Sequence, residues 1–123
     1  MKIDIQTKRI YEAADPEDGY RVLVDRLWPR GVAKSHAAVD LWLKEIAPST
    51  ALRQWFNHDP SKWTAFKSSY FEELDGKPDL AATLLEKAAT SRLTLLFSAR
   101  DLKNNQAIAL KEYLIGYAGN GSG

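Results

Sequence analysis

Apolar residues follow two kinds of pattern along this chain. Short apolar runs within residues 2–11, 20–26 and 92–98 indicate three β-strands. In the second of these, Val22, Leu23 and Val24 form an unbroken run, which is typical of a strand buried on both faces of a sheet covered by helices. The turn-forming residues between 13 and 19 indicate an exposed connection between the first two strands.

The other apolar positions recur at helical spacing and predict five helices, at residues 35–46, 50–56, 60–74, 79–89 and 105–117. Ser35 is the expected N-cap of the first helix, and Asp79 that of the fourth. Asp59 followed by Pro60 begins the third helix, because proline at the first helical position loses no hydrogen bond. Gly76 is the expected end of that helix.

This order of elements predicts a single compact α/β domain over residues 1–118, with a small sheet of about three partly parallel strands covered by helices. Residues 119–123, Gly-Asn-Gly-Ser-Gly, are expected to form a flexible C-terminal tail. Ligands of α/β sheets usually bind beyond the carboxyl ends of the strands. If the second and third strands are parallel neighbours, residues 25–30 and 98–101 therefore meet in one crevice.

The net charge, the cysteine content and the lack of long apolar runs exclude several classes of protein. The formal net charge of +1 disfavours nucleic acid as a partner, since nucleic-acid-binding domains usually carry a strongly basic surface. The absence of cysteine excludes disulfides, thiolate nucleophiles and cysteine-bound metals, and agrees with a cytoplasmic location. No signal peptide or membrane-spanning apolar run is recognisable, so we expect a soluble cytoplasmic protein with no membrane partner.

Basic residues gather between positions 20 and 34, where Arg21, Arg26, Arg30 and Lys34 stand against Asp25 alone. The planar fork of arginine binds phosphate and carboxylate groups through two parallel hydrogen bonds, so this segment predicts a pocket for a small anion. The predicted ligand-binding residues are Arg26, Trp28, Arg30, Trp42, Lys44, Arg53 and Arg100.

A structural role for the same arginines is the alternative. Arg26 and Arg30 would then pair with carboxylates and tie helices onto the sheet. Side chains alternate along a strand, so Asp25 and Arg26 point to opposite faces and each needs its own partner. The carboxylates available for such pairs are Asp25, Asp40, Glu45 and Asp101.

Candidates for catalysis are few, namely Asp25, His58 and Asp101. His58 lies in a turn between two predicted helices, where a histidine acts as a general base or bonds to the backbone. Ser98 follows a strand but lacks the flanking glycines of a nucleophile elbow. No metal site is expected from two distant histidines, and no cofactor is expected because no phosphate-binding glycine loop occurs.

Several segments resemble the domain of unknown function 488 family of bacteria, in its YeaO-like branch. They read R-V-L-V-D-R-L-W-P-R-G at 21–31, D-L-W-L-K-E-I-A-P-S at 40–49, L-R-Q-W-F-N-H-D-P at 52–60, W-T-A-F-K-S-S-Y-F-E-E-L at 63–74 and T-L-L-F-S-A-R-D at 94–101. The resemblance implies a small α/β domain and no particular activity. Where the family usually has Asn-His-Ala, this chain has Asn105-Gln106-Ala107, so no role for a titrating histidine is expected there.

Two functions stay open on these grounds. The first is a cytoplasmic protein, an enzyme or a binding protein, that holds a small anion between the ends of two strands. The second is a non-enzymatic interaction module whose basic rim contacts nucleic acid or an acidic protein. The near-neutral charge makes nucleic acid the weaker version of the second.

Overall fold

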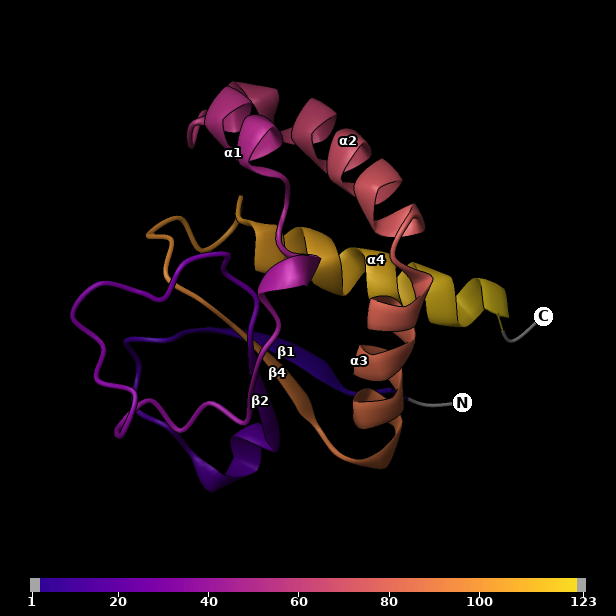
Figure 1. Ribbon diagram of the computed structural model, residues 1–123. Coiled ribbons are helices and arrows are strands. Elements are labelled where there is room, and N and C mark those ends of the chain that lie inside the picture. The colour runs from indigo at the N-terminus through magenta and orange to yellow at the C-terminus, as the bar shows by residue number, and fades with distance from the viewer. Residues whose placement is uncertain (1–2, 122–123) are drawn as a thin grey trace.

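A sheet of parallel strands, four of them in the part of the chain that the structure describes, forms the centre of the molecule (Figure 1). The computed structural model describes residues 3–121. The strands are β1 (Ile5–Arg9), β2 (Tyr20–Leu23), β3 (Leu41–Trp42) and β4 (Leu93–Phe97), in the spatial order β1-β4-β2-β3. The second and third predicted strands, β2 and β4, are parallel neighbours. The α/β class is therefore confirmed, with one strand more than expected.

Within the described residues, four α-helices and three short 3-10 helices accompany the sheet. The 3-10 helices are η1 (Pro16–Asp18), η2 (Lys44–Ile46) and η3 (Pro60–Lys62), and the α-helices are α1 (Thr50–Phe56), α2 (Trp63–Asp75), α3 (Pro78–Thr90) and α4 (Gln106–Gly121). Ser49 caps α1 by accepting a hydrogen bond from the Leu52 N–H. Asp59 and Pro60 begin the turn that leads into α2, and Gly76 ends that helix, as predicted.

One face of the sheet packs against α3 and α4, with α2 completing the larger hydrophobic core. Val22 and Leu95 point to this face, where they meet Tyr70 of α2 and Leu114 of α4 in one fully buried cluster. The Tyr70 hydroxyl donates to the Ile46 carbonyl at 2.7 Å, so this tyrosine also fastens η2 to the helices.

A loop, rather than a helix, covers the other face. Leu23 and Leu96, which alternate with the residues above, pack with Ala37 and the edge of Trp42 in a smaller cluster. The second strand is thus buried on both faces as predicted, but residues 24–40 provide the second cover.

The helix predicted for residues 35–46 is wrong. In its place the chain forms a loop, then β3, then η2. Arg21 explains the difference, because its guanidinium donates to the Ala37 and Ala38 carbonyls at 3.0 and 2.8 Å. The Asp40 carboxylate accepts from the Arg21 N–H, which places Leu41–Trp42 beside β2. Backbone pairing at the sheet edge thus replaces the helix that the apolar spacing favours.

Smaller differences lie elsewhere. Residues 13–19 are not wholly exposed, since they contain η1 and the buried Asp18. Helix α3 begins at Pro78, so Asp79 lies in its first turn and not at its cap. Helix α4 continues to Gly121, into the segment expected to be a tail, and Ser122–Gly123 lie outside the described residues. Within residues 3–121, no helix has the length and apolar character needed to span a membrane.

Candidate functional site

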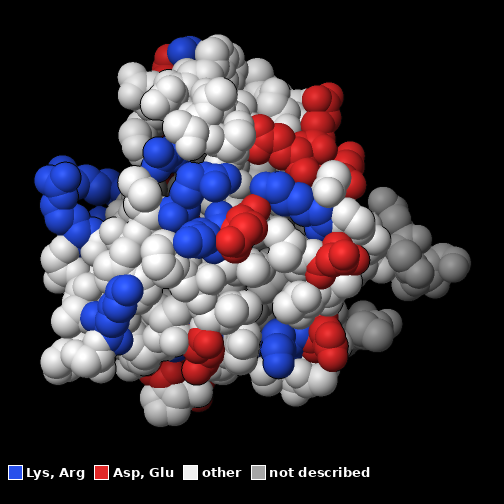
Figure 2. Space-filling model, in the orientation of Figure 1, with Lys and Arg blue, Asp and Glu red and all other residues white. Residues whose placement is uncertain are grey.

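A hollow of about 710 Å³ opens at the carboxyl ends of β2 and β4. Three segments and one residue of α2 line it: residues 25–30 after β2, residues 98–101 and 104–106 after β4, residues between 47 and 58 at α1, and Phe66. The two strand ends line the same hollow because β2 and β4 are parallel neighbours. In Figure 2, lysine and arginine atoms form a band across the middle of one face, whereas acidic atoms gather at its upper right.

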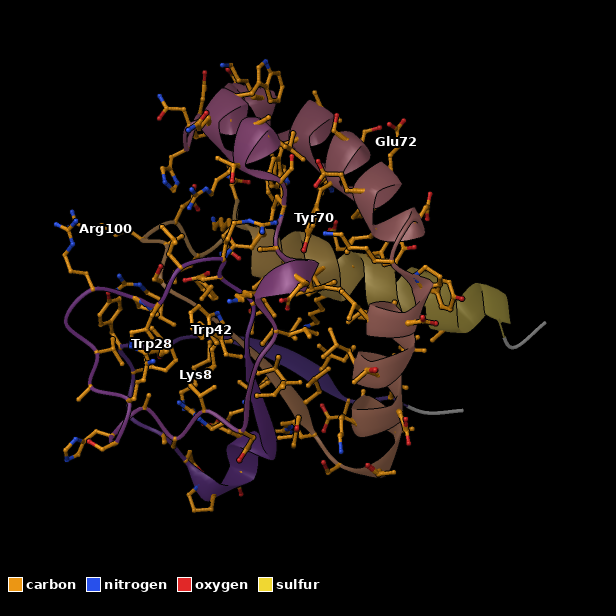
Figure 3. The ribbon with its side chains drawn as sticks, viewed as in Figure 1. Lys8, Trp28, Trp42, Tyr70, Glu72 and Arg100 are labelled. Carbon is orange, nitrogen blue, oxygen red and sulfur yellow. The ribbon has the colours of Figure 1, made fainter. Side chains whose placement is uncertain are left out.

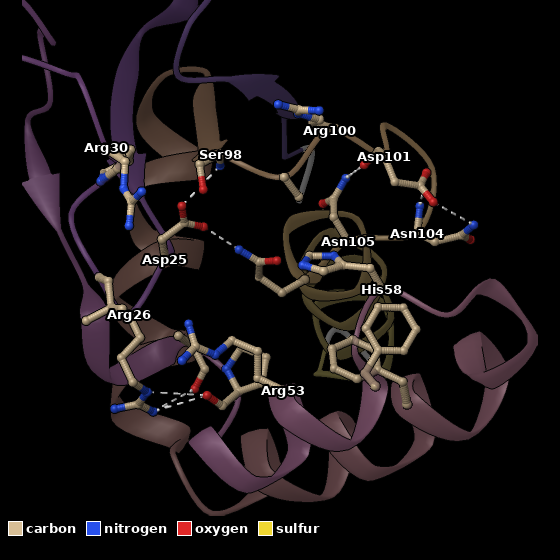
Figure 4. Close-up of a pocket in the computed structure, with 18 of the residues that line it drawn as sticks. Asp25, Arg26, Arg30, Arg53, His58, Ser98, Arg100, Asp101, Asn104 and Asn105 are labelled. Atoms are coloured by element: carbon tan, nitrogen blue, oxygen red, sulfur yellow. Dashed lines mark hydrogen bonds between the residues drawn. The ribbon is translucent and has the colours of Figure 1, made fainter.

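Asp25 lies at the base of the hollow and is only 8% exposed. Its carboxylate accepts hydrogen bonds from the Ser98 N–H at 3.0 Å and from the Gln106 side-chain amide, and Figure 4 shows it directed toward Ser98. Burial raises the pKa of Asp25, and the hydrogen bonds from Ser98 and Gln106 oppose that rise only in part. Asp25 is thus a buried carboxylate whose bonded partners are all uncharged.

Arg26 points away from Asp25, as alternation along the strand predicts (Figure 4). Its guanidinium donates to the Pro48 and Ala47 carbonyls at 3.2 Å each. Arg26 therefore ties the end of β2 to the segment before α1 and forms one wall of the hollow. It uses backbone carbonyls for this role, not the carboxylates considered as its partners.

Arg30, Arg53 and Arg100 also line the hollow, and each is exposed. The ion pairs among residues 3–121 join Lys8 and Arg21 to Asp18, Lys67 to Glu112, and Arg92 to Asp4. No pocket arginine takes part in them. The pairing of Arg30 with a nearby carboxylate, which the structural alternative requires, is therefore absent from the described part of the chain.

The loop after β2 is itself held in place. The Tyr11 hydroxyl donates to the Arg30 carbonyl at 2.9 Å, and the Trp28 indole donates to the Val32 carbonyl at 2.7 Å. Gly31 adopts a positive φ of 78°, which allows the chain to turn directly after Arg30. The backbone that carries Arg30 is thus fixed on both sides of the residue.

His58 reaches the hollow through an unusual backbone conformation. Asn57 and His58 have φ angles of 46° and 55°, in the left-handed region that few residues other than glycine adopt. Two such residues in succession turn the chain sharply between α1 and η3 and place His58 in the wall of the hollow. His58 is exposed, and its ring centroid lies 6.5 Å from that of Phe56.

Asp101 organises the loop that precedes α4. Its carboxylate accepts hydrogen bonds from the N–H groups of Lys103 and Asn104, at 2.9 and 3.0 Å. These bonds hold the pKa of Asp101 below its ordinary value. Asn105 donates to the Asp101 carbonyl and caps α4 by accepting from the Ile108 N–H. The oxygens of Asp101 therefore serve the loop, although the residue lines the hollow.

Two of the predicted ligand-binding residues, Trp42 and Lys44, do not line the hollow. The Trp42 indole donates to the Asp25 carbonyl at 2.8 Å and packs edge-on against Trp28, with ring centroids 5.5 Å apart (Figure 3). Lys44 lies over the Trp42 ring at 5.4 Å. Trp42 thus supports the pocket loop from behind, whereas Trp28 belongs to the lining.

Other lining residues were not predicted from the sequence. Phe56 and Phe66 form an apolar wall with stacked rings 4.4 Å apart, although helical spacing marks Phe66 only as a core residue. Gln106 and Asn105 reach the hollow because α4 begins beside the end of β4. The sequence signal that could have identified them is their position at the start of a helix that follows a parallel strand, where ligands of α/β sheets usually bind.

Comparison with known proteins yields a consistent match. A family model described as the inactive DUF488-N3 subclade matches residues 4–119. The uncharacterized protein YeaO of Escherichia coli K12 is 43% identical over 112 residues, which cover 91% of this chain and 97% of YeaO. The uncharacterized proteins Rv3073c of Mycobacterium tuberculosis and Mb3100c of Mycobacterium bovis are each 39% identical over 112 residues, which cover 91% of this chain and 94% of theirs. No solved structure matches the chain.

Proposed function

This chain belongs to the DUF488 family, in the branch that includes YeaO, and we propose that it binds an anionic small molecule at the hollow described above. The ligand carries a phosphate or carboxylate group, and the protein holds it without converting it. The proposal includes a cytoplasmic location, which the cysteine-free composition favours.

One observation carries this proposal: four arginines line one concave site and none of them has a carboxylate partner among the described residues. Arg21, which serves the fold, is by contrast paired with the Asp18 carboxylate. Unpaired guanidinium groups around a hollow leave their donors available to an anion. Arg26 is the least available of the four, because it already donates to two carbonyls.

The lining also suits a ligand larger than a bare ion. Pockets for small molecules commonly span about 300–1,000 Å³ and combine apolar walls with a few polar groups. This hollow, at about 710 Å³, has such walls in Phe56, Phe66 and Trp28. A phosphate or carboxylate joined to an apolar body matches this mixture.

Binding without turnover is supported by the polar groups at the base. Gln106, which contacts Asp25, neither takes up nor releases a proton near neutral pH. The other two catalytic candidates, His58 and Asp101, lie on separate loops, and Asp101 is engaged by its own loop. The description of the matching family model as inactive also supports binding without turnover.

A thermal-shift screen of phosphates, nucleotides and carboxylates against wild type and Arg30→Ala tests the proposal. A ligand at about a hundred times its dissociation constant adds about 2.7 kcal/mol to the free energy of unfolding, which raises Tm by about 10 °C for a domain of this size. Arg30→Ala removes one charge-assisted contact, so we expect binding to weaken roughly tenfold and the shift to fall to about half.

Lys103→Ala is the matched control, because it removes the same charge just outside the lining and is expected to keep the full shift. The proposal fails if no anion raises the Tm of wild type. A Tm that falls by several degrees in ligand-free Arg30→Ala, with unchanged ligand shifts, would instead assign Arg30 to the fold.

A second candidate function is an interaction module for an acidic protein. It is favoured by Leu27, which lines the hollow, and Leu102, which follows the lining residue Asp101; they are 64% and 60% exposed. The dependence of affinity on salt concentration distinguishes the two candidate functions. Binding through many surface charges weakens steeply with added salt, whereas the affinity for one ligand in a formed pocket depends on salt only weakly. A steep dependence on salt would favour the interaction module.

A further inference from the structure

Asp25 presents an unusual combination of burial and charge. A carboxylate that is 8% exposed normally has a cationic partner, because burying an uncompensated charge is costly. Among residues 3–121, Asp25 has only uncharged donors, the Ser98 N–H and the Gln106 amide. No ion pair among residues 3–121 includes it.

Cations are nevertheless close by, around the same hollow. Arg26 turns to the Ala47 and Pro48 carbonyls, and Arg53 influences Asp25 through its charge without forming an ion pair. The buried Asp25 carboxylate and the pocket arginines therefore line the same hollow without forming an ion pair with one another. A ligand that fits this arrangement carries a positive group that faces Asp25 and a negative group that faces the arginines.

The lining of the same hollow is partly apolar. Phe56 and Phe66, which are 5% and 2% exposed, contribute stacked rings to the lining, and Pro48 and Ala99 add further apolar surface. Such a wall accommodates a short hydrocarbon segment better than a second charged group.

We propose that the ligand is dipolar, with its anionic group held by the pocket arginines and an ammonium or N–H group at the other end held by Asp25. This inference rests on the proposed anion site and deepens it. Hydrogen bonds between ionised groups are shorter and stronger than neutral ones, so an ammonium at Asp25 supplies the cation that this carboxylate lacks. The raised pKa of Asp25 agrees with a carboxylate that has no such partner in the free protein.

Aminoalkyl phosphates of increasing chain length, each paired with the alkyl phosphate of the same length, test this inference by isothermal titration calorimetry. At the length that spans the hollow, the amino compound is expected to bind wild type at least about tenfold more tightly than its partner. In Asp25→Asn this preference disappears, and alkyl phosphates bind at least as tightly as in wild type because a negative charge has been removed.

Glu45→Gln is the matched control. It removes a negative charge two residues from the lining Ala47, without touching the hollow, and keeps the preference for the amino compound. A third ligand series, in which the amine is trimethylated, uses wild type alone and so does not depend on how a variant folds. Those compounds keep the positive charge but cannot donate a hydrogen bond, so they are expected to lose most of the preference.

The outcomes separate the two proposals. If alkyl and aminoalkyl phosphates bind wild type equally, and Arg30→Ala weakens both, the anion site stands and the dipolar inference is overturned. Persistence of the preference in Asp25→Asn overturns it as well. If neither series binds wild type, the anion site fails and the inference fails with it.

Discussion

Two buried aspartates near the ends of β2 show how single residues differ in this fold. Although burial raises the pKa of Asp18, hydrogen bonds from the Asp15 N–H, Lys8 and Arg21 hold it below the ordinary value of 3.8. Burial raises the pKa of Asp25, and the hydrogen bonds from Ser98 and Gln106 and the charge of Arg53 do not reverse that rise. The same residue type therefore stabilises the fold at one position and serves a pocket at the other.

These shifts predict opposite effects of removing each charge. Asp18 contributes stability above pH 3.8 that is lost as the pH falls through its lowered pKa. Asp18→Asn leaves Arg21 buried without its carboxylate, so we expect a loss of roughly 3 kcal/mol at neutral pH. Asp25 costs stability once the pH rises through its raised pKa, so Asp25→Asn is expected to raise the free energy of unfolding.

Urea denaturation at neutral pH and at a pH well below 3.8 measures both effects. Once the pH falls below the lowered pKa of Asp18, both aspartates are protonated, and the differences between each variant and wild type should shrink. An Asp25→Asn variant that is less stable than wild type at neutral pH would show that its hydrogen bonds outweigh its desolvation.

Among the elements, the pairing of β2 with β4 depends on the glycine that precedes β2. Gly19 has φ +67°, and a Cβ atom at this position would lie 2.2 Å from the Arg92 carbonyl oxygen. That oxygen accepts from the Tyr20 N–H at 2.8 Å, next to the first register pair of the two strands. A side chain at Gly19 therefore disturbs the contact on which the position of both strand ends depends.

Gly19→Ala is expected to lower the free energy of unfolding by about 3 kcal/mol or more, through the clash and the unfavourable φ together. Gly31→Ala is the matched comparison, because Gly31 also has a positive φ, +78°, but a Cβ there meets nothing within 4 Å. Its cost should be about 1 kcal/mol. Equal losses in the two variants, measured by chemical denaturation, would contradict a role for the Arg92 contact.

At the scale of the whole molecule, α2 holds the segment that forms one wall of the hollow. The Glu73 carboxylate accepts from the Ser49 N–H and hydroxyl at 2.8 and 2.6 Å. The Tyr70 hydroxyl and the Lys77 ammonium bond to the carbonyls of Ile46 and Glu45. Because Arg26 bonds to the next carbonyls in this segment, α2 connects the wall to the end of β2.

Glu73→Ala therefore affects both stability and binding. We expect the free energy of unfolding to fall by about 1–2 kcal/mol, since two donors of Ser49 lose their acceptor, and anion affinity to fall with it. Glu72→Ala removes the same charge from the exposed side of α2 (Figure 3) and should change stability by less than about 0.5 kcal/mol. Unchanged anion affinity in a folded Glu73→Ala protein would show that the wall does not need α2.

Local signals in the sequence predicted much of this architecture. The caps at Ser49 and Asp59 act within one helical turn, so the bounds of α1 and the start of the next helix followed from neighbouring residues. The apolar run of β2 and the α/β order also followed, and with them the meeting of the two strand ends in one hollow. These features depend on contacts between residues close in sequence or on a general rule of parallel sheets.

Tertiary structure alone decided the rest. The stripe that includes Trp42 satisfies helical spacing, yet Arg21 and the edge of β2 recruit residues 37–42 through bonds that no local pattern encodes. That change moved Trp42 and Lys44 out of the lining. Only the packed fold placed Gln106 against Asp25 and left Arg30 without a carboxylate partner among residues 3–121, because these relations join segments far apart in the chain. The sequence by itself determined the class of fold and the arginines that line the hollow, and long-range packing determined which other residues join them there and which hydrogen bonds each makes.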